Sequence, residues 1–368
     1  MQTFLNQLVY FGFFQSLFLL TIYLFSSKNR QNINGYIAFL IFVLFLGLSG
    51  HILYISEIFG ANRKLISISE FATLFFGATV YLFTKSSLLG QRFSYGELVH
   101  YIPGIVYTLF ILFYFTLAPK EVINARVRSG ELFTVVSMVI GIALIVNITY
   151  WAASVYHFYE FRKRMLNELS YSVKTQFFLN FLIAIGVCLF VWVGIYFISF
   201  MGYDMIEIEA RQGIWLGIAF IILFIAYYSM TEPEIFKEQP LATVQKYAQS
   251  KLSLADLDRL KANLEQLMEE KKPYLANKLL KAELAEMMGI SNPELARLLN
   301  ERIGMNFFEY VNYFRIKEFI RLAQSEQAQN MTFFGLAQEA GFNSKSTFNK
   351  SFKQLMGQTP REYLAGKY

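Results

Sequence analysis

Long apolar stretches alternate with short polar loops over the first 230 residues of the chain. Each stretch approaches the roughly 20 apolar residues that a helix needs to cross a hydrocarbon layer about 30 Å thick. Of these stretches, only the second and the third contain an acidic, basic or histidine side chain, His51 and Glu70 respectively. The pattern predicts seven membrane-spanning helices, at residues 3–26, 35–56, 65–84, 101–117, 132–156, 175–203 and 213–228.

The pattern changes at Thr231, because charged residues occur throughout the part of the chain that follows. Ser253, with Asp256 three residues later, has the form of a helix N-cap with an acidic partner. In the predicted helix, leucines recur at spacings of three and four residues: Leu257, Leu260, Leu264 and Leu267. This stripe fits a short coiled coil between two protomers, and hence a homodimer, or an apolar face packed on the following domain.

Two similar helical units follow. Residues 279–303 form a helix, a turn at Gly289 and a second helix that Ser291 would cap; residues 332–355 repeat the order with Gly341 at the turn and Asn343 as the cap. This is the pattern of a helix-turn-helix unit. Between them, residues 307–324 predict an amphipathic helix about 27 Å long. A spacer of that length would hold two reading helices near the ~34 Å repeat of one DNA turn.

The closing sequence GFNSKSTFNKSFKQLMGQTPREYL, together with the two units and their linking helix, resembles the DNA-binding domain of AraC/XylS-type transcription regulators. The resemblance covers residues 278–364 without a gap. It implies sequence-specific binding of double-stranded DNA, with the second helix of each unit in successive major grooves. It also implies RNA polymerase as a partner if the protein is an activator.

The resemblance gives candidate DNA contacts. In the first reading helix these are Asn292, Glu294 and Arg297, with Ala296 where many members carry a polar residue that contacts a base. In the second they are Lys345, Ser346, Asn349 and Lys350. Lysine and arginine suit guanine edges, and asparagine suits adenine. The candidate phosphate contacts, which would set the register of the protein on the duplex, are Arg315, Lys317, Lys353 and Arg361.

Composition supports a membrane protein. Apolar residues make up 55% of the chain and charged residues only 16%. The net charge of +6 permits an anionic partner without requiring one. A single cysteine, Cys188, excludes a disulfide framework. With three histidines and no recognisable nucleophile, phosphate-binding or metal-binding motif, the sequence predicts no enzyme, no cofactor and no metal site.

A DNA-binding region must lie in the cytoplasm, so seven spans place the N-terminus outside the cytoplasmic (inner) membrane; the loops then carry a weak positive-inside bias. Polar groups inside spans are costly and mark candidate functional positions. The candidates for sensing a signal are Glu70, His51 and Asn147, with His51 close enough to reach Glu70 if their helices are neighbours. The basic loop at 157–176 would couple the two halves or bind anionic lipid head groups.

The predicted fold is all-α: a seven-helix transmembrane domain at 1–231, a linker and leucine-striped helix at 232–272, and a DNA-binding domain at 273–368. The hypothesis is a membrane-bound one-component transcription regulator that senses an unidentified small-molecule, lipid-borne or envelope signal. A transporter or channel with an appended regulatory domain is the alternative, against which stand few buried charges and no clearly broken helix. A domain that has become a protein-interaction module is a third possibility.

Overall fold

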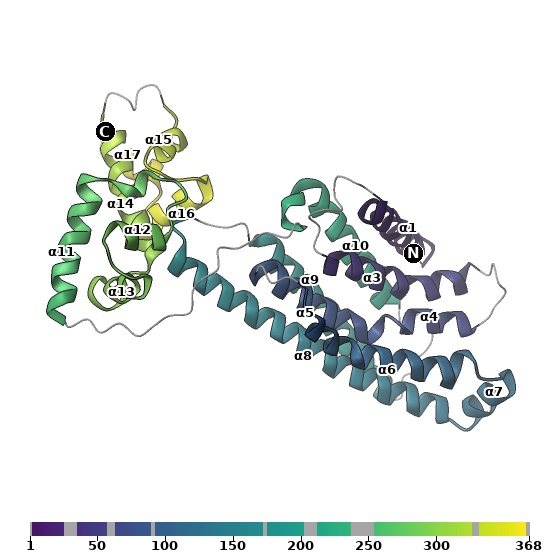
Figure 1. Cartoon of the computed structure of the whole chain (residues 1–368). Coiled ribbons are helices and arrows are strands. Elements are labelled where there is room, and N and C mark those ends of the chain that lie inside the picture. The colour runs from purple at the N-terminus through teal and green to yellow at the C-terminus, as the bar shows by residue number, and fades with distance from the viewer. Residues whose placement is uncertain are drawn as a thin grey trace. The chain divides into compact units, whose positions relative to one another are not determined.

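The computed structural model describes residues 2–25, 35–56, 63–89, 93–171, 175–201, 212–236, 254–325 and 331–365. Within these ranges the chain forms helices and turns and no β-strand (Figure 1). It divides into two compact units. The first comprises Met1–Tyr159 and Thr175–Ala242, and the second comprises Glu160–Lys174 and Thr243–Tyr368.

The first unit contains seven helical segments long and apolar enough to cross a membrane, in agreement with the seven predicted stretches. A short helix, α7, lies between the fourth and the fifth. The helices are α1 (Gln2–Phe25), α3 (Gly35–Ile55), α4 (Ser67–Glu70) with α5 (Thr73–Leu89), α6 (Ile102–Ile111), α7 (Lys120–Arg128), α8 (Glu131–Glu168), α9 (Gln176–Phe200) and α10 (Gln212–Thr231).

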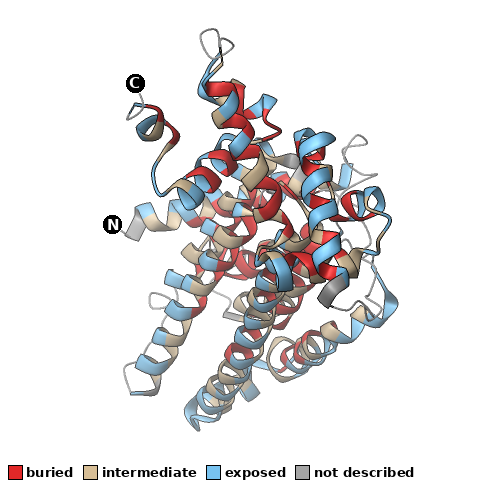
Figure 2. Cartoon of the chain, turned by 90° about the vertical axis from the view of Figure 1, so that its left-hand side faces the viewer, coloured by how far each residue is buried: buried red, intermediate tan, exposed pale blue. Residues whose placement is uncertain are grey.

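Within this unit, α3 packs against α1, α5 and α10, and α10 also packs against α1 and α9. The outward faces remain apolar: Phe14 is 61% exposed, Phe113 68% and Phe190 79%. Figure 2 shows where buried and exposed positions lie along the helices. Large apolar surfaces of this kind mark contact with a membrane or another protein. The exterior of the unit is therefore compatible with a lipid-facing surface.

The third predicted span is a broken helix, because α4 ends at Glu70 and α5 begins at Thr73. Across this point the Thr73 hydroxyl donates to the Glu70 carboxylate at 3.4 Å. The interruption is a short turn: Phe71 keeps right-handed helical dihedrals, and Lys64–Leu89 as a whole remains long and apolar enough to cross a membrane. The expectation that no span is clearly broken therefore holds only in part.

The fifth predicted span is longer than expected. It was predicted at 132–156, but α8 continues to Glu168, a length of 38 residues or about 57 Å. This is well beyond the roughly 30 Å of a hydrocarbon core. Its last residues, including the basic run from Arg162 to Arg164, follow Glu160 and belong to the second unit.

The second unit contains α11 (Leu254–Glu270), α12 (Lys281–Met287), α13 (Asn292–Arg297), α14 (Phe307–Ala323), α15 (Phe333–Glu339), α16 (Lys345–Met356) and α17 (Pro360–Ala365). Helix α14 contributes to two apolar clusters. Its first half packs with α11, α12 and α13, and its second half packs with α15, α16 and α17.

The leucine stripe of α11 belongs to the first of these clusters. Leu257 and Leu264 are fully buried and Leu260 is 8% exposed, while Leu267 packs at the edge. The sequence left open a coiled coil between two protomers or packing on the following domain; in the structure the leucine stripe packs within its own domain. The predicted cap, Ser253, lies outside the described residues.

Candidate nucleic-acid interface

Helices α12 and α13 form the first helix pair, joined by a turn at Gly289. This residue has a positive φ of 68°, which glycine adopts without strain. Ser291 caps α13 as predicted, since its hydroxyl accepts from the backbone N–H of Glu294, and the Glu294 carboxylate accepts from the backbone N–H of Ser291. The sequence therefore fixes where α13 begins.

All three candidate base contacts on α13 interact within the protein. Glu294 forms the capping box, and Arg297 donates from Nε to Glu301 at 2.9 Å. The third, Asn292, donates from Nδ2 to Glu168 at 3.3 Å. A glutamate bound into a cap is poorly placed to accept from a base, whereas an arginine in an exposed i,i+4 pair exchanges partners at little cost.

Helices α15 and α16 form the second helix pair. Gly341 at the turn has φ of 93°. A Cβ at this position would lie 2.3 Å from the carbonyl oxygen of Tyr274, so only glycine fits. The cap of α16 is Ser344 and not the predicted Asn343: the Ser344 hydroxyl accepts from the backbone N–H of Thr347, while the Asn343 side-chain oxygen points into the interior.

One face of α16 is buried and the other is exposed. Phe348 and Phe352 are buried, and the Phe348 ring lies 4.6 Å from that of Phe319 on α14. The helix contains three lysines and no acidic residue. Its exposed polar residues recur at helical spacing and therefore share the outer face: Lys345, Ser346, Asn349, Lys350 and Lys353. The structure thus brings together all four base-contact candidates of this helix and one phosphate candidate.

Arg315 requires a correction, because this predicted phosphate contact is buried, with 1% exposure. Its guanidinium donates to three backbone carbonyls: from Nε to Tyr274 at 2.7 Å, from Nη2 to Ala276 at 2.7 Å and from Nη1 to Ser170 at 2.6 Å. Burial lowers the pKa of Arg315 to about 10. Arg315 joins segments of the second unit and is not available to a phosphate in this structure.

The other phosphate candidates lie at the surface: Lys317, Lys353 and Arg361 are exposed. The Lys317 ammonium lies 4.7 Å from the centroid of the Tyr313 ring, so the lysine stem follows the surface of α14. Each of these three side chains has room to reach an anion.

The segment that ends α8 contacts the first helix pair, within the second unit. Leu169 forms an isolated antiparallel bridge with Leu280, next to the start of α12. The Lys281 ammonium, 1% exposed, lies 2.6 Å from the Glu168 carboxylate. The same carboxylate accepts from Asn292. Asn292 was predicted as a base contact and the loop at 157–176 as a coupler, but the contact between Glu168 of that loop and Asn292 was not predicted.

The three candidate sensing residues in the first unit are separate from one another. Glu70 accepts from the hydroxyls of Tyr107 at 2.9 Å and Thr73 at 3.4 Å. His51 stacks on Trp215 with ring centroids 3.5 Å apart. Helices α3 and α4, which carry His51 and Glu70, are neighbours as the prediction required, but the ring nitrogens of His51 form no hydrogen bond, so His51 does not hydrogen-bond to Glu70.

Asn147 joins α8 to the broken span. Its side-chain oxygen accepts from the backbone N–H of Gly77 at 2.8 Å, and its Nδ2 donates to the carbonyls of Thr73 and Ala143. These bonds use both donors of the amide and one of the two lone pairs of its oxygen, so Asn147 links α8 to α5. Among the described residues, no group of three or more His, Cys, Asp or Glu side chains has the arrangement of a metal site.

Comparison with known proteins identifies the C-terminal region. Residues 284–366 match a family described as a helix-turn-helix domain. Over 82 residues the chain is 32% identical to a protein of Staphylococcus aureus (strain COL) described as an uncharacterized HTH-type transcriptional regulator. That stretch is 22% of this chain and 11% of the relative. No solved structure matches the chain. The C-terminal region therefore carries a helix-turn-helix domain, which supports DNA binding.

Proposed function

We propose that the protein is a membrane-bound transcription regulator. It binds specific DNA through two helix-turn-helix units and is controlled by a signal sensed in or across the membrane. The observation that carries this proposal is the outer face of α16, where exposed lysines and Asn349 lie side by side without an acidic residue in the helix. A face of this kind suits the edges of bases and the phosphates beside them.

The two units would act together on one duplex. Helix α13 is the reading helix of the first unit and α16 that of the second. Helix α14 links them and, with 17 residues, is about 25 Å long. Two major-groove contacts separated by one turn of DNA require a spacing near 34 Å.

We assign most of the base recognition to α16 and a supporting role to α13, because Ala296 and the capped Glu294 leave α13 with fewer base contacts.

The domain assignment follows from this function. Residues 1–231 form the membrane domain, 232–272 the linker with α11, and 273–368 the DNA-binding domain. The DNA-binding domain faces the chromosome in the cytoplasm, and with seven spans the N-terminus lies outside. Lipid contacts the apolar exterior of the first unit. RNA polymerase is a further partner if the protein activates transcription. A homodimer would bind two copies of the DNA site.

Control of DNA binding would act through the end of α8. Glu168 bonds to Asn292, a candidate base contact, and to Lys281 at the start of α12. A carboxylate beside the start of a reading helix repels DNA phosphates. We infer that this arrangement is a restrained state and that a signal releases Glu168 from the helix pair.

Selection from a random duplex library tests DNA recognition directly, with the full chain in lipid nanodiscs at physiological salt. The expected result is an enriched motif with two half-sites about one helical turn apart. Lys350→Ala should relax the preference for one base pair in the half-site read by α16, whereas Lys261→Ala on α11, whose side chain is 42% exposed, should leave the motif unchanged. A library that shows no enriched motif would contradict sequence-specific regulation.

A transporter or channel with an appended DNA-binding domain is the second candidate. The break between Glu70 and Thr73 favours it, because interrupted helices line substrate sites in many transporters. Uptake of solutes into vesicles that contain the full chain decides between the two. Transport that persists in Lys350→Ala while no DNA motif is enriched would support the transporter.

A further inference from the structure

Helices of the first unit pack closely beside the break in the third span. On α3, Gly50 allows close approach: a Cβ there would lie 2.6 Å from the hydroxyl and 2.7 Å from the backbone nitrogen of Ser69, just before the break. On α8, Asn147 donates to the carbonyl of Thr73, where α5 begins. Irregular backbone at membrane depth is tolerated where it is buried in protein and its polar groups have partners. The break meets this condition at Thr73.

A cavity of about 150 Å³ lies at this break. Residues from α3, α4, α5, α8, α9 and α10 line it, and most of them are apolar. Three aromatic side chains contribute to the wall: Phe76, Trp192 and Trp215. Glu70 provides the only carboxylate among the lining residues.

The carboxylate of Glu70 is held in a fixed position. Its Oε2 accepts from the hydroxyl of Tyr107, which is 7% exposed, and from that of Thr73 across the break. A carboxylate supported in this way is preorganised to receive a further donor. Aromatic walls bind cations over their faces, in addition to apolar groups. A carboxylate among aromatic rings is therefore complementary to a protonated amine.

We propose that this cavity binds a small lipophilic amine, with its ammonium group at Glu70 and an apolar body between the aromatic side chains. The cavity has room for at least one aromatic ring, because a protein cavity of about 150 Å³ accommodates benzene, and it is partly open, which leaves space for a small substituent on the ring. Binding of the amine is inferred from the geometry of the cavity alone. That the amine is the controlling signal rests on the proposed function.

The test uses two probes of matched shape, 4-bromobenzylamine and 4-bromotoluene, with the full chain in phosphatidylcholine nanodiscs. Bromine quenches nearby tryptophan fluorescence, and two of the three tryptophans line the cavity. The amine should quench in a saturable manner at a concentration at least about tenfold below that of bromotoluene, the advantage expected of a charge-assisted hydrogen bond. Equal quenching by both probes would overturn the proposal, since generic partition into lipid or into the cavity would then suffice.

Glu70→Gln separates charge from shape. This variant keeps an oxygen that accepts from Tyr107, and it should lose about tenfold in affinity for the amine while its response to bromotoluene is unchanged. Glu131→Gln is the charge-matched control, because Glu131 lies 51% exposed at the start of α8 and does not line the cavity. Retention of amine binding by Glu70→Gln would contradict the assignment.

A second pair of variants tests the location independently of Glu70. Ile140→Phe adds volume to the cavity wall, and Ile145→Phe adds the same volume on the same helix at a position that is 68% exposed. Ile140→Phe should abolish saturable quenching and Ile145→Phe should preserve it; the same response from both would place the amine elsewhere. These results are independent of DNA binding. If the chain enriches a DNA motif but shows no preference for the amine, only the cavity proposal is contradicted. If it prefers the amine but enriches no DNA motif, only the proposed regulator function is contradicted.

Discussion

Arg315 and Ser170 are separated by 145 residues and joined by two hydrogen bonds. The Arg315 Nη1 donates to the Ser170 carbonyl at 2.6 Å, and Nη2 donates to the Ser170 hydroxyl at 3.0 Å. Both residues are buried, with exposures of 1% and 0%. A buried guanidinium requires acceptors for its donors. The segment that follows α8 is therefore part of the folded second unit.

We expect Arg315→Ala to destabilise the second unit by about 3 kcal/mol, because three backbone carbonyls lose a charged donor. Lys317→Ala, at an exposed position of the same helix, should change the stability by less than about 0.5 kcal/mol. Urea unfolding of the full chain, followed by pulse proteolysis of the second unit, measures both. Equal effects would mean that the hydrogen bonds of Arg315 contribute little.

The two turn glycines should differ in their tolerance of alanine. Gly341→Ala would bring a Cβ within 2.3 Å of the Tyr274 carbonyl oxygen and 3.0 Å of Arg315 Nε. At Gly289 nothing lies within 4 Å, so only the positive φ is unfavourable, at a cost of about 1 kcal/mol. Gly341→Ala should lower the unfolding midpoint far more than Gly289→Ala. A similar loss from both would show that the turn yields to the added methyl group.

Periodicity predicted the long helices of the described residues, but not α7 or the extension of α8 to Glu168. Apolar runs identified all seven long helices, and the leucine spacing identified α11. Ser291 was predicted as a cap because this short polar side chain follows the turn at Gly289 and precedes the second helix, and the structure confirms it. These features depend on local sequence, which is why they were predictable without a structure.

The errors are of two kinds. Local signals were misread at Asn343, where Ser344 is the cap, and at Arg315, which lies four residues from both Val311 and Phe319 and so on the buried stripe of α14. Other features depend on long-range contacts that no local pattern contains, such as the stacking of His51 on Trp215, a residue of the last span.

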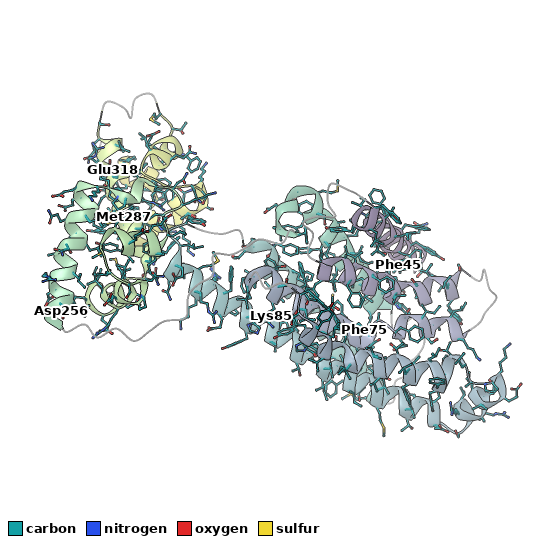
Figure 3. All side chains as sticks on the ribbon, in the orientation of Figure 1. Phe45, Phe75, Lys85, Asp256, Met287 and Glu318 are labelled. Carbon is teal, nitrogen blue, oxygen red and sulfur yellow. The ribbon has the colours of Figure 1, made fainter. Side chains whose placement is uncertain are left out.

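Glu318 gives the second unit a dependence on pH (Figure 3). Hydrogen bonds from Arg321, with a further contribution from Lys272, lower the pKa of Glu318, whose side chain is 9% exposed. The resulting stabilisation is fully present above the unfolded pKa, near about 4.3, and is lost as the pH falls through the lower folded pKa. Glu318→Gln should therefore lose less stability than the parent between about pH 6 and about pH 3.

The control for this experiment is Glu265→Gln on α11, where the carboxylate is 52% exposed. This variant should retain the acid sensitivity of the parent. Pulse proteolysis of the full chain at each pH provides the measurement. Parallel stability curves for the parent and Glu318→Gln would exclude Glu318 as a source of the pH dependence.

Release of the α8 segment should strengthen DNA binding. Glu168→Gln removes the negative charge beside Asn292 and weakens the contact with Lys281. The affinity of the full chain for its selected DNA should rise about five- to tenfold, within the range of allosteric coupling energies. Glu286→Gln, an exposed position on α12, removes the same charge without that contact and should have little effect. Fluorescence anisotropy at fixed salt measures the affinities, and equal values for the two variants would contradict the restraint.

Two lysines on α16 should have distinct roles. Lys350→Ala should weaken binding by about 1–3 kcal/mol and relax the preference for one base pair. Lys353→Ala should weaken binding to all sequences alike and reduce the salt dependence by about one phosphate contact. Titrations at several salt concentrations, with selected and scrambled duplexes, separate the two effects. Identical behaviour of the two variants would mean that α16 contacts only the DNA backbone.

The central claim, that a membrane-embedded chain binds specific DNA, is tested most directly by genome-wide mapping of DNA crosslinked to the full-length protein in its native host. The account predicts discrete sites that share a motif with two half-sites about one DNA turn apart. It also predicts that Lys350→Ala loses these sites while the protein remains in the membrane fraction. Uniform recovery of DNA, with no sites that depend on Lys350, would contradict it.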